Sequence, residues 1–225
     1  MITRIEIDGF KSFRKFTLDL QPFQVFIGPN GAGKSNLFDA IQLLSYIAGS
    51  ETLAEAFSKG RGGAFDQFSA LPGDTDHAQT MTFAVEMLIA RQTNDETQLE
   101  CRVSATRLRY ELQIERTVDK GQPRLAVQNE ALHSKSSKND LWVEKHIPAS
   151  QRERWVTWAE SEGYGWFIAK TSGGRYIVRD EKSDQVSLNF QSALGRSLLS
   201  FTGNILDRPT IHAARQEMLR WQVLH

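Results

Sequence analysis

The sequence predicts an α/β fold in which a mixed sheet surrounds one buried strand and is joined to an antiparallel β-subdomain and a helical segment. Three observations predict it. A short apolar run, 24–27, leads into a glycine-rich loop and then into a stretch whose apolar residues have helical spacing. Two later segments, 81–89 and 107–115, alternate apolar and polar residues as strands do. Helical spacing returns in the last stretch, 191–225.

Composition indicates a soluble globular chain. Of its 225 residues 40% are hydrophobic, yet no apolar run approaches the roughly 20 residues that cross a bilayer. The N-terminus has no secretion signal, so we expect a cytoplasmic protein with no membrane partner. Lys plus Arg and Asp plus Glu number 27 each, so any DNA contact must be a local patch. The single cysteine, Cys101, excludes an internal disulfide and a cysteine-based zinc cluster, and we expect it half-buried in a strand.

The N-terminal elements are predicted from alternation and from breakers. Strands are expected over 2–7 and 16–20, joined by a hairpin through 10–15. Pro22 then ends the second strand. The run Gln24–Ile27 lacks polar alternation, which is typical of a strand buried on both faces, so it is predicted to be the central strand.

Helical spacing predicts the next two elements. Apolar residues at 37, 40, 41, 44, 47 and 48 predict a helix over 36–48, which Gly49 ends. A second short helix is expected over 51–57, followed by a flexible loop at 60–63.

The alternating strands 81–89 and 107–115 each have one polar face, which predicts an antiparallel sheet. Leu125 and Val127, with a turn at Asn129-Glu130, predict a further hairpin strand that closes this sheet.

The composition changes again in the region 134–190, which we interpret as an insertion. A polar linker precedes a helix carrying Trp155 and Trp158, whose spacing favours a core face over a base-stacking platform. Thr171–Gly174 is predicted to be a β-turn before a strand over 175–178. Helices are then expected over 192–199 and 211–221, the second capped by Thr210.

Chemistry is concentrated in the run 28–35, which matches the phosphate-loop pattern G-x-x-x-x-G-K-[ST] between a predicted strand and a predicted helix. Its glycines allow backbone N–H groups to point into one concavity, and the helix adds its positive dipole end. Lys34 is expected to reach the β and γ phosphates of ATP, and the Ser35 hydroxyl to hold Mg²⁺. The alternative is a structural glycine turn before a helix.

Hydrolysis needs an acidic residue at the end of a second buried strand. No four-residue apolar run ends in Asp-Glu or Asp-Asp, and alternation places Glu86 on the wet face of its strand. The chain alone is therefore expected to be inactive or nearly so.

The segments 9–13, 27–41 and 61–63 together resemble the N-terminal lobe of an ABC-type ATPase head of the SMC, RecF and RecN kind, and the chain is similar to compact bacterial AAA-family ATPases without a long coiled coil. The resemblance implies a P-loop NTPase N-terminal lobe, with Lys34 and Arg61 as candidate catalytic residues. Arg61 would approach the nucleotide or the dimer partner, and the alternative for it is a solvated loop arginine. The resemblance also implies Ser35 and Gln191 as the groups on Mg²⁺, and the alternative for Gln191 is an ordinary residue at the start of a helix. It implies that ATP is held by Gly28, Pro29, Asn30, Gly31, Ala32, Gly33, Lys34, Ser35, Asn36 and Lys11.

Such heads also carry a signature loop and an Asp-Glu strand in a C-terminal lobe, and this sequence shows neither. We therefore expect an N-terminal fragment of a longer ATPase. Its parts are a nucleotide-binding core over 1–63, an antiparallel sheet over 64–133, the insertion over 134–190 and a helical segment over 191–225 that leads to the absent lobe.

The resulting hypothesis is an ATP·Mg²⁺-binding lobe that hydrolyses ATP only when completed by a C-terminal lobe and dimerised through ATP sandwiched between two heads. DNA repair, chromosome maintenance or antiphage defence, with DNA and an effector protein as partners, follow by analogy alone. The alternative is a noncatalytic nucleotide-binding or interaction module. A kinase or GTPase is disfavoured, because no Asn/Thr-Lys-x-Asp motif and no arginine-rich lid occur.

Overall fold

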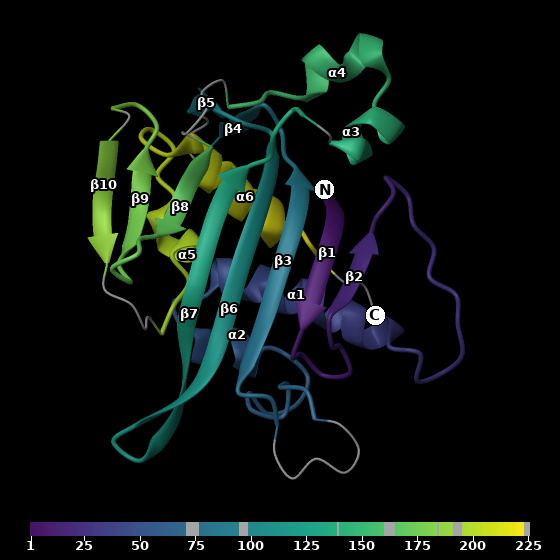
Figure 1. The fold of residues 1–225 in the computed structure, drawn as a ribbon, viewed down its shortest axis with the longest axis vertical. Helices are drawn as coiled ribbons and strands as arrows, with labels where there is room; N and C mark the ends of the chain where they lie inside the picture. The colour runs from purple at the N-terminus through teal and green to yellow at the C-terminus, as the bar shows by residue number, and fades with distance from the viewer. Residues whose placement is uncertain are drawn as a thin grey trace.

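The protein is one antiparallel sheet with helices packed on one of its faces (Figure 1). The computed structural model describes residues 1–70, 77–94, 99–138, 140–159, 165–183, 185–190 and 195–222. None of the helices in these ranges has the length and apolarity needed to cross a bilayer. The predicted α/β class is confirmed, with a sheet whose described pairings are all antiparallel.

The sheet has eight described strands, and the first two strands of the chain form one end of it. Their order is β10 (Gln185–Phe190), β9 (Tyr176–Asp180), β8 (Trp166–Lys170), β7 (Gln122–Ser134), β6 (Arg107–Asp119), β3 (Thr80–Leu88), β1 (Ile2–Asp8) and β2 (Phe16–Asp19). A separate two-stranded ribbon pairs β4 (Gln92–Asn94) with β5 (Glu100–Arg102). Cys101 lies in β5 and is partly buried, as predicted.

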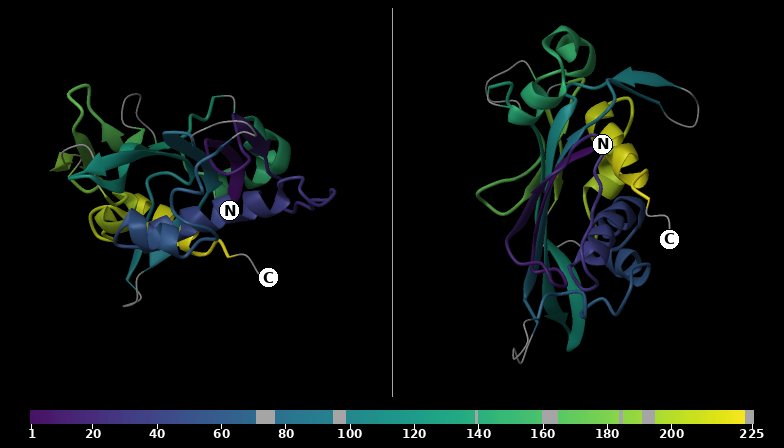
Figure 2. Two further views of the ribbon diagram at one scale, coloured as in Figure 1. Left: turned by 90° about the horizontal axis from the view of Figure 1, so that it is seen from below. Right: turned by 90° about the vertical axis from the view of Figure 1, so that its right-hand side faces the viewer.

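Four helices cover one face of the sheet: α1 (Lys34–Gly49), α2 (Leu53–Ser58), α5 (Leu199–Thr202) and α6 (Pro209–Leu219). Figure 2 shows this layer edge-on, and α1 contacts α2, α5 and α6 within it. The helices α3 (Leu141–His146) and α4 (Ala149–Trp155) lie at one end of the sheet. The helix that follows the glycine-rich loop, α1, is therefore anchored in the main core.

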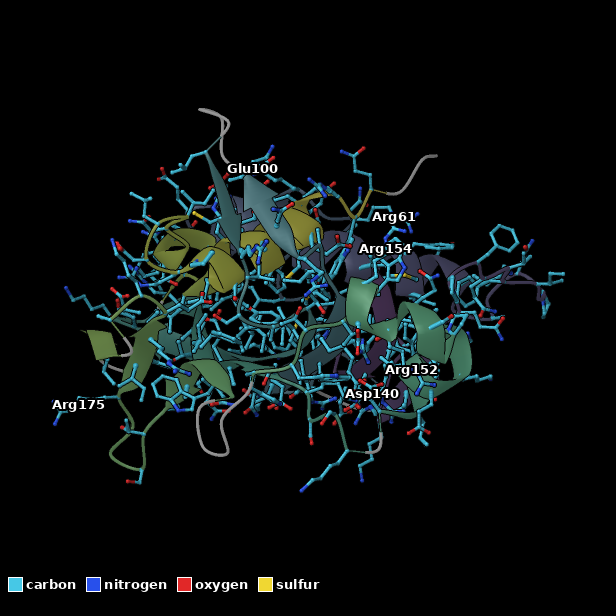
Figure 3. All side chains as sticks on the ribbon, turned by 90° about the horizontal axis from the view of Figure 1, so that it is seen from above. Arg61, Glu100, Asp140, Arg152, Arg154 and Arg175 are labelled. Carbon is cyan, nitrogen blue, oxygen red and sulfur yellow. The ribbon has the colours of Figure 1, made fainter. Side chains whose placement is uncertain are left out.

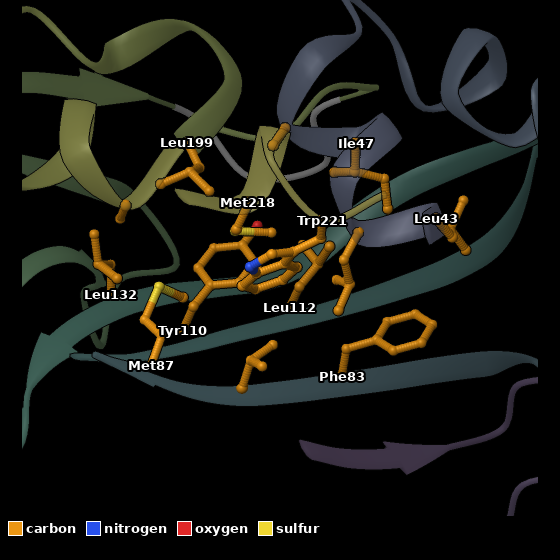
Figure 4. Packing of buried hydrophobic residues seen from close by; sticks show 14 of the residues in the cluster. Leu43, Ile47, Phe83, Met87, Tyr110, Leu112, Leu132, Leu199, Met218 and Trp221 are labelled. Carbon is orange, nitrogen blue, oxygen red and sulfur yellow. The ribbon is translucent and has the colours of Figure 1, made fainter. Parts of the chain in front are cut away.

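The core lies between the sheet and the α1–α6 layer (Figure 4). The predicted alternation is confirmed in β6, where Leu108, Tyr110, Leu112 and Ile114 are fully buried. They meet side chains of α1 and α6 such as Leu43 and Met218 in one hydrophobic cluster. Burial of apolar surface on this scale is the main stabilising contribution to the fold.

The other face of the sheet is lined by charged side chains. Arg109 of β6 donates two hydrogen bonds to Glu6 of β1, at 3.0 and 2.9 Å. Arg4 adds a bond of 2.9 Å to the same carboxylate. These bonds, that of Arg109 foremost, outweigh burial and lower the pKa of Glu6 from 4.5 to about 2. The face that alternation leaves polar is thus held together by cross-strand ion pairs.

The predicted central strand 24–27 is wrong. This segment forms no strand, and Val25 and Ile27 are 58% and 92% exposed. The sheet ends at β2, which pairs with β1 alone among the described strands. The chain leaves this edge through Pro22, and 24–27 pairs with no described strand. Within it only Phe26 is partly buried, against the main core and against Phe38 of α1, with ring centroids 5.9 Å apart. An apolar run indicates that a segment is suited to burial, but it does not determine whether a neighbouring strand lies beside it.

The turn predicted at Asn129-Glu130 is also wrong, and β7 does not close the sheet. Both residues lie inside β7, and the hairpin turns at Lys120 and Gly121, whose φ values of 51° and 78° are typical of a type I′ turn. Glu130 is fully buried and accepts hydrogen bonds from the backbone N–H groups of Leu198 and Leu199, at 2.7 and 3.0 Å. Burial raises the pKa of Glu130 above its ordinary value, although the bonds it accepts oppose that rise.

Several helix boundaries differ from the predictions. Gly49 is the last residue of α1 rather than its stop, and a Cβ there would lie 2.9 Å from Leu219 Cδ2, so this glycine lets α6 approach. In the 192–199 prediction, 192–194 lie outside the described residues and the helix begins only at Leu199. Thr210 is inside α6 and bonds Glu181 instead of capping the helix.

The two tryptophans of the 134–190 region do not share a helix. The helix α4 ends at Trp155, which is 55% exposed, whereas Trp158 lies beyond that helix. Trp158 packs against a small apolar cluster that includes Val143 and Ile147. The shared core face predicted for the pair is therefore wrong, because the chain leaves the helix between them.

Candidate nucleotide-binding site

The glycine-rich loop lies between the exposed segment 24–27 and the first turn of α1. Gly31 and Gly33 have φ values of 84° and 88°, in the left-handed region that other residues rarely adopt. A Cβ at Gly31 would meet nothing within 4 Å, so glycine is required there for backbone conformation rather than for space. This spacing of glycines thus fixes the path of the loop into α1.

The N-terminus of α1 is free to accept an anion. Gly33 is its N-cap, with no side-chain cap hydrogen bond and no acidic residue in the first turn. The first N–H groups of a helix lack intrahelical acceptors, and they carry the positive end of its dipole. Residues 30–36 line an open cavity of about 340 Å³ at this point. The geometry fits a phosphate group.

Lys34 lies across the mouth of the loop. Its Nζ donates to the carbonyl oxygens of Gly28 and Pro29, at 2.6 and 2.8 Å. An anion in the cavity would offer the ammonium group a charged acceptor in place of two neutral ones, and charge-assisted hydrogen bonds are stronger. Ser35 follows at the cavity wall, where a hydroxyl could hold a cation beside the phosphate.

Asn36 ties α1 to the loop at 9–13. Its Nδ2 donates to Ser12 Oγ at 2.8 Å, and the same Ser12 oxygen would lie 3.7 Å from a Cβ built on Gly33. The segments 9–13 and 28–36, whose order in the sequence carries the family resemblance, are therefore in contact.

Lys11 and Arg61 meet at one carboxylate, that of Asp39 in α1. Lys11 Nζ lies 2.7 Å from Asp39 Oδ2, and Arg61 donates through Nε and Nη2 at 3.0 and 2.7 Å to Oδ1. Figure 3 labels Arg61. The predicted contact of these two cations with nucleotide stays a prediction. Sequence reasoning missed Asp39, although its place four residues after Ser35 puts it on the same helix face.

Two other predicted features have clear outcomes. Thr171–Gly174 is a β-turn, with Gly174 N–H donating to Thr171 O at 2.9 Å between β8 and β9, as predicted. Glu86 lies on the charged face but is 8% exposed rather than wet, because Lys135 and Arg107 cover it at 2.6 and 3.5 Å. Gln191, the predicted magnesium sensor, lies outside the described residues.

A family model for the AAA ATPase domain matches residues 1–154. Two curated proteins share shorter segments with the chain. The chromosome partition protein Smc of Methanocaldococcus jannaschii is 51% identical over 41 residues, which are 18% of this chain and 4% of that protein. The DNA replication and repair protein RecF of Acidothermus cellulolyticus is 38% identical over 56 residues, 24% of this chain and 15% of that protein.

One solved structure comes from a study of ATP-driven dimerisation and DNA-stimulated activation of SMC ATPases. The alignment covers 64% of this chain and 75% of that chain, at 19% identity and a TM-score of 0.39. A TM-score of this size does not establish a shared fold. The curated relatives carry the resemblance instead, and the chain matches only a small part of their length.

Proposed function

Because this chain belongs to the AAA ATPase domain family and carries an SMC- and RecF-like N-terminal region, we propose that Gly28–Ser35 binds ATP with Mg²⁺. The uncapped N-terminus of α1, entered through left-handed Gly31 and Gly33, carries the proposal. Lys34 exchanges its carbonyl acceptors for the β and γ phosphates, and the Ser35 hydroxyl holds Mg²⁺. When bound, the metal neutralises charge on the phosphates.

Hydrolysis in this proposal requires a C-terminal lobe and a dimer of heads with ATP between them. Two observations support it. The sequence has no apolar run that ends in the acidic pair needed for magnesium and water. Beside the phosphate loop, Phe23 and Ile27 are 81% and 92% exposed, and exposed apolar side chains of this kind are typical of a surface that another part of a protein covers. Gln191 then completes the magnesium site.

The role of the switched dimer is proposed from the relatives. Those relatives are named for chromosome partition and for DNA replication and repair. We therefore propose a cytoplasmic ATPase that acts in chromosome maintenance, DNA repair or antiphage defence, with DNA and an effector protein as partners. A noncatalytic nucleotide-binding module is the second candidate, since the chain lacks the catalytic acid. Steady-state ATP turnover by the purified chain would contradict both of these proposals.

Isothermal calorimetry with ATP·Mg²⁺ tests the site. We expect Lys34→Ala to weaken binding at least about tenfold, because hydrogen bonds to charged groups contribute about 1.5–3 kcal/mol. Lys182→Ala is the matched control: it removes the same charge in the turn between β9 and β10, at the opposite end of the sheet from β2. Equal affinity in Lys34→Ala and the unaltered chain would contradict the proposal.

A further inference from the structure

Asp39 lies at the centre of the only described contact that joins Lys11, Arg61 and α1. Its side chain is 8% exposed, and within α1 it follows Ser35 by four residues and Asn36 by three. Residues at these spacings lie on one helix face, about one turn apart. A buried carboxylate thus lies about one helical turn from Ser35 and Asn36, which line the cavity, and two cations from separate loops neutralise it.

The contacts of Arg61 are one-sided. Nε lies 3.0 Å from Oδ1 of Asp39, and Nη2 lies 2.7 and 2.9 Å from its two oxygens. Among the described residues Nη1 has no acceptor, and the Arg61 side chain is 59% exposed. A guanidinium group has N–H donors on more than one edge. Asp39 therefore fixes one edge of Arg61 and leaves another available.

Lys11 is held in an unfavourable backbone conformation at the same place. Its φ of 46° lies in the left-handed region, which costs a residue with a side chain about 1 kcal/mol or more. The contacts that hold it are the Asp39 ion pair and a backbone hydrogen bond of 2.8 Å from Lys11 N–H to Gln67 O. Strain kept in this way is frequent at ligand sites.

We infer that Asp39 is a positioning residue of the nucleotide site: it orients Arg61 so that the free guanidinium edge meets a phosphate of bound ATP. The inference rests on the proposed function, since it needs a triphosphate in the loop. Net charge supports it, because one carboxylate faces two cations and the cluster keeps a positive charge for an anion.

Calorimetric titration with ATP·Mg²⁺ tests the inference on four proteins: the unaltered chain, Arg61→Gln, Asp39→Asn and the double variant. We expect each single change to weaken binding about tenfold and the double variant to be little weaker than either, because Asp39 acts through Arg61. A purely structural aspartate would lower affinity equally with or without Arg61. Unaltered affinity in Asp39→Asn, or additive losses in the double variant, would overturn the inference.

Two controls separate the possible failures. If Lys34→Ala loses affinity while Asp39→Asn retains it, only this inference fails; if Lys34→Ala binds normally, the proposed function fails. Glu55→Gln should leave the affinity for ATP·Mg²⁺ unchanged, because it removes only an exposed carboxylate of α2 that pairs with Lys59.

A second variant keeps the test open if Asp39→Asn does not fold. Arg61→Lys retains the charge and an ion pair with Asp39 but lacks the planar group with two usable edges. We expect it to weaken ATP binding about as much as Arg61→Gln does. Full affinity in Arg61→Lys would overturn the inference, since charge alone would then suffice.

Discussion

At the scale of single residues, the charged face of the sheet shows how polar side chains connect strands far apart in sequence. Arg109 lies between Glu6 of β1 and Glu111 of its own strand, at 2.9 and 2.6 Å. Arg4 extends the same network to Asp19 of β2, at 2.7 Å. The edge hairpin that leads to the phosphate loop is thus joined to β6 by ion pairs that cross β3, while its backbone hydrogen bonds go to β3.

Glu6→Gln should lower the free energy of unfolding at pH 7 by about 1 kcal/mol, a value reduced from the full shift because solvent screens a partly exposed pair. The pKa of Glu6 is lowered from 4.5 to about 2 on folding. A lowered pKa means that this stabilisation is present above pH 4.5 and is lost as the pH falls toward 2. Urea unfolding of the unaltered chain and of Glu6→Gln should therefore show a smaller difference in the free energy of unfolding at pH 3 than at pH 7.

Glu100→Gln provides the control for that measurement, because it removes an exposed carboxylate on β5 (labelled in Figure 3). If the loss of unfolding free energy caused by Glu6→Gln became larger at low pH, the assigned ion pair would be contradicted.

At the scale of elements, the loop after β1 depends on one glycine. Gly9 has a φ of 73°, and a Cβ there would lie 2.2 Å from the carbonyl oxygen of Thr80 in β3. Ser69 N–H donates to Gly9 O at 2.8 Å, which fixes the loop on the sheet. The loop that carries Lys11 and Ser12 to α1 therefore starts from a backbone contact that no side chain permits.

Gly9→Ala should destabilise the protein more than Gly121→Ala. Both glycines have left-handed φ values, 73° and 78°, but a Cβ at Gly121 meets nothing within 4 Å. The conformational penalty of about 1–2 kcal/mol is common to both variants, so their difference isolates the clash, which we expect to add about 2 kcal/mol. Chemical denaturation measures both, and equal losses would show that β3 yields to the added methyl group.

At the scale of the whole molecule, the helices cover one face of the sheet, whereas the segment before the phosphate loop contacts the core only through Phe26. Ile7 in β1 is 1% exposed, whereas Ile27 is 92% exposed. The described part of this chain is therefore stabilised mainly by the sheet and the α1–α6 layer, and within 24–27 only Phe26 packs against that core.

The same substitution at the two isoleucines tests this description. Ile27→Ser should change the free energy of unfolding by less than about 0.5 kcal/mol, as exposed substitutions do. Ile7→Ser should lower it by about 3–5 kcal/mol, because it removes buried methyl groups and buries a hydroxyl. Thermal or urea unfolding of this chain measures both. A comparable loss in Ile27→Ser would show that 24–27 is packed in solution.

The sequence by itself determined the features that depend on neighbouring residues. Alternation predicted β1, β2, β3 and β6 with their buried faces, and the glycine-rich pattern predicted the loop before α1. The β-turn at 171–174 followed from its composition. These features are readable because φ preference and side-chain period act within a few residues.

Tertiary structure alone decided which distant groups meet. Glu130 lies inside β7 because α5 offers its N–H groups, and nothing local marks that partner. Asp39 binds Lys11 and Arg61 from separate loops, and 24–27 forms no strand because the described sheet ends at β2. Local patterns specify conformation and which face is buried, whereas the identity of a partner depends on long-range packing that the pattern does not encode.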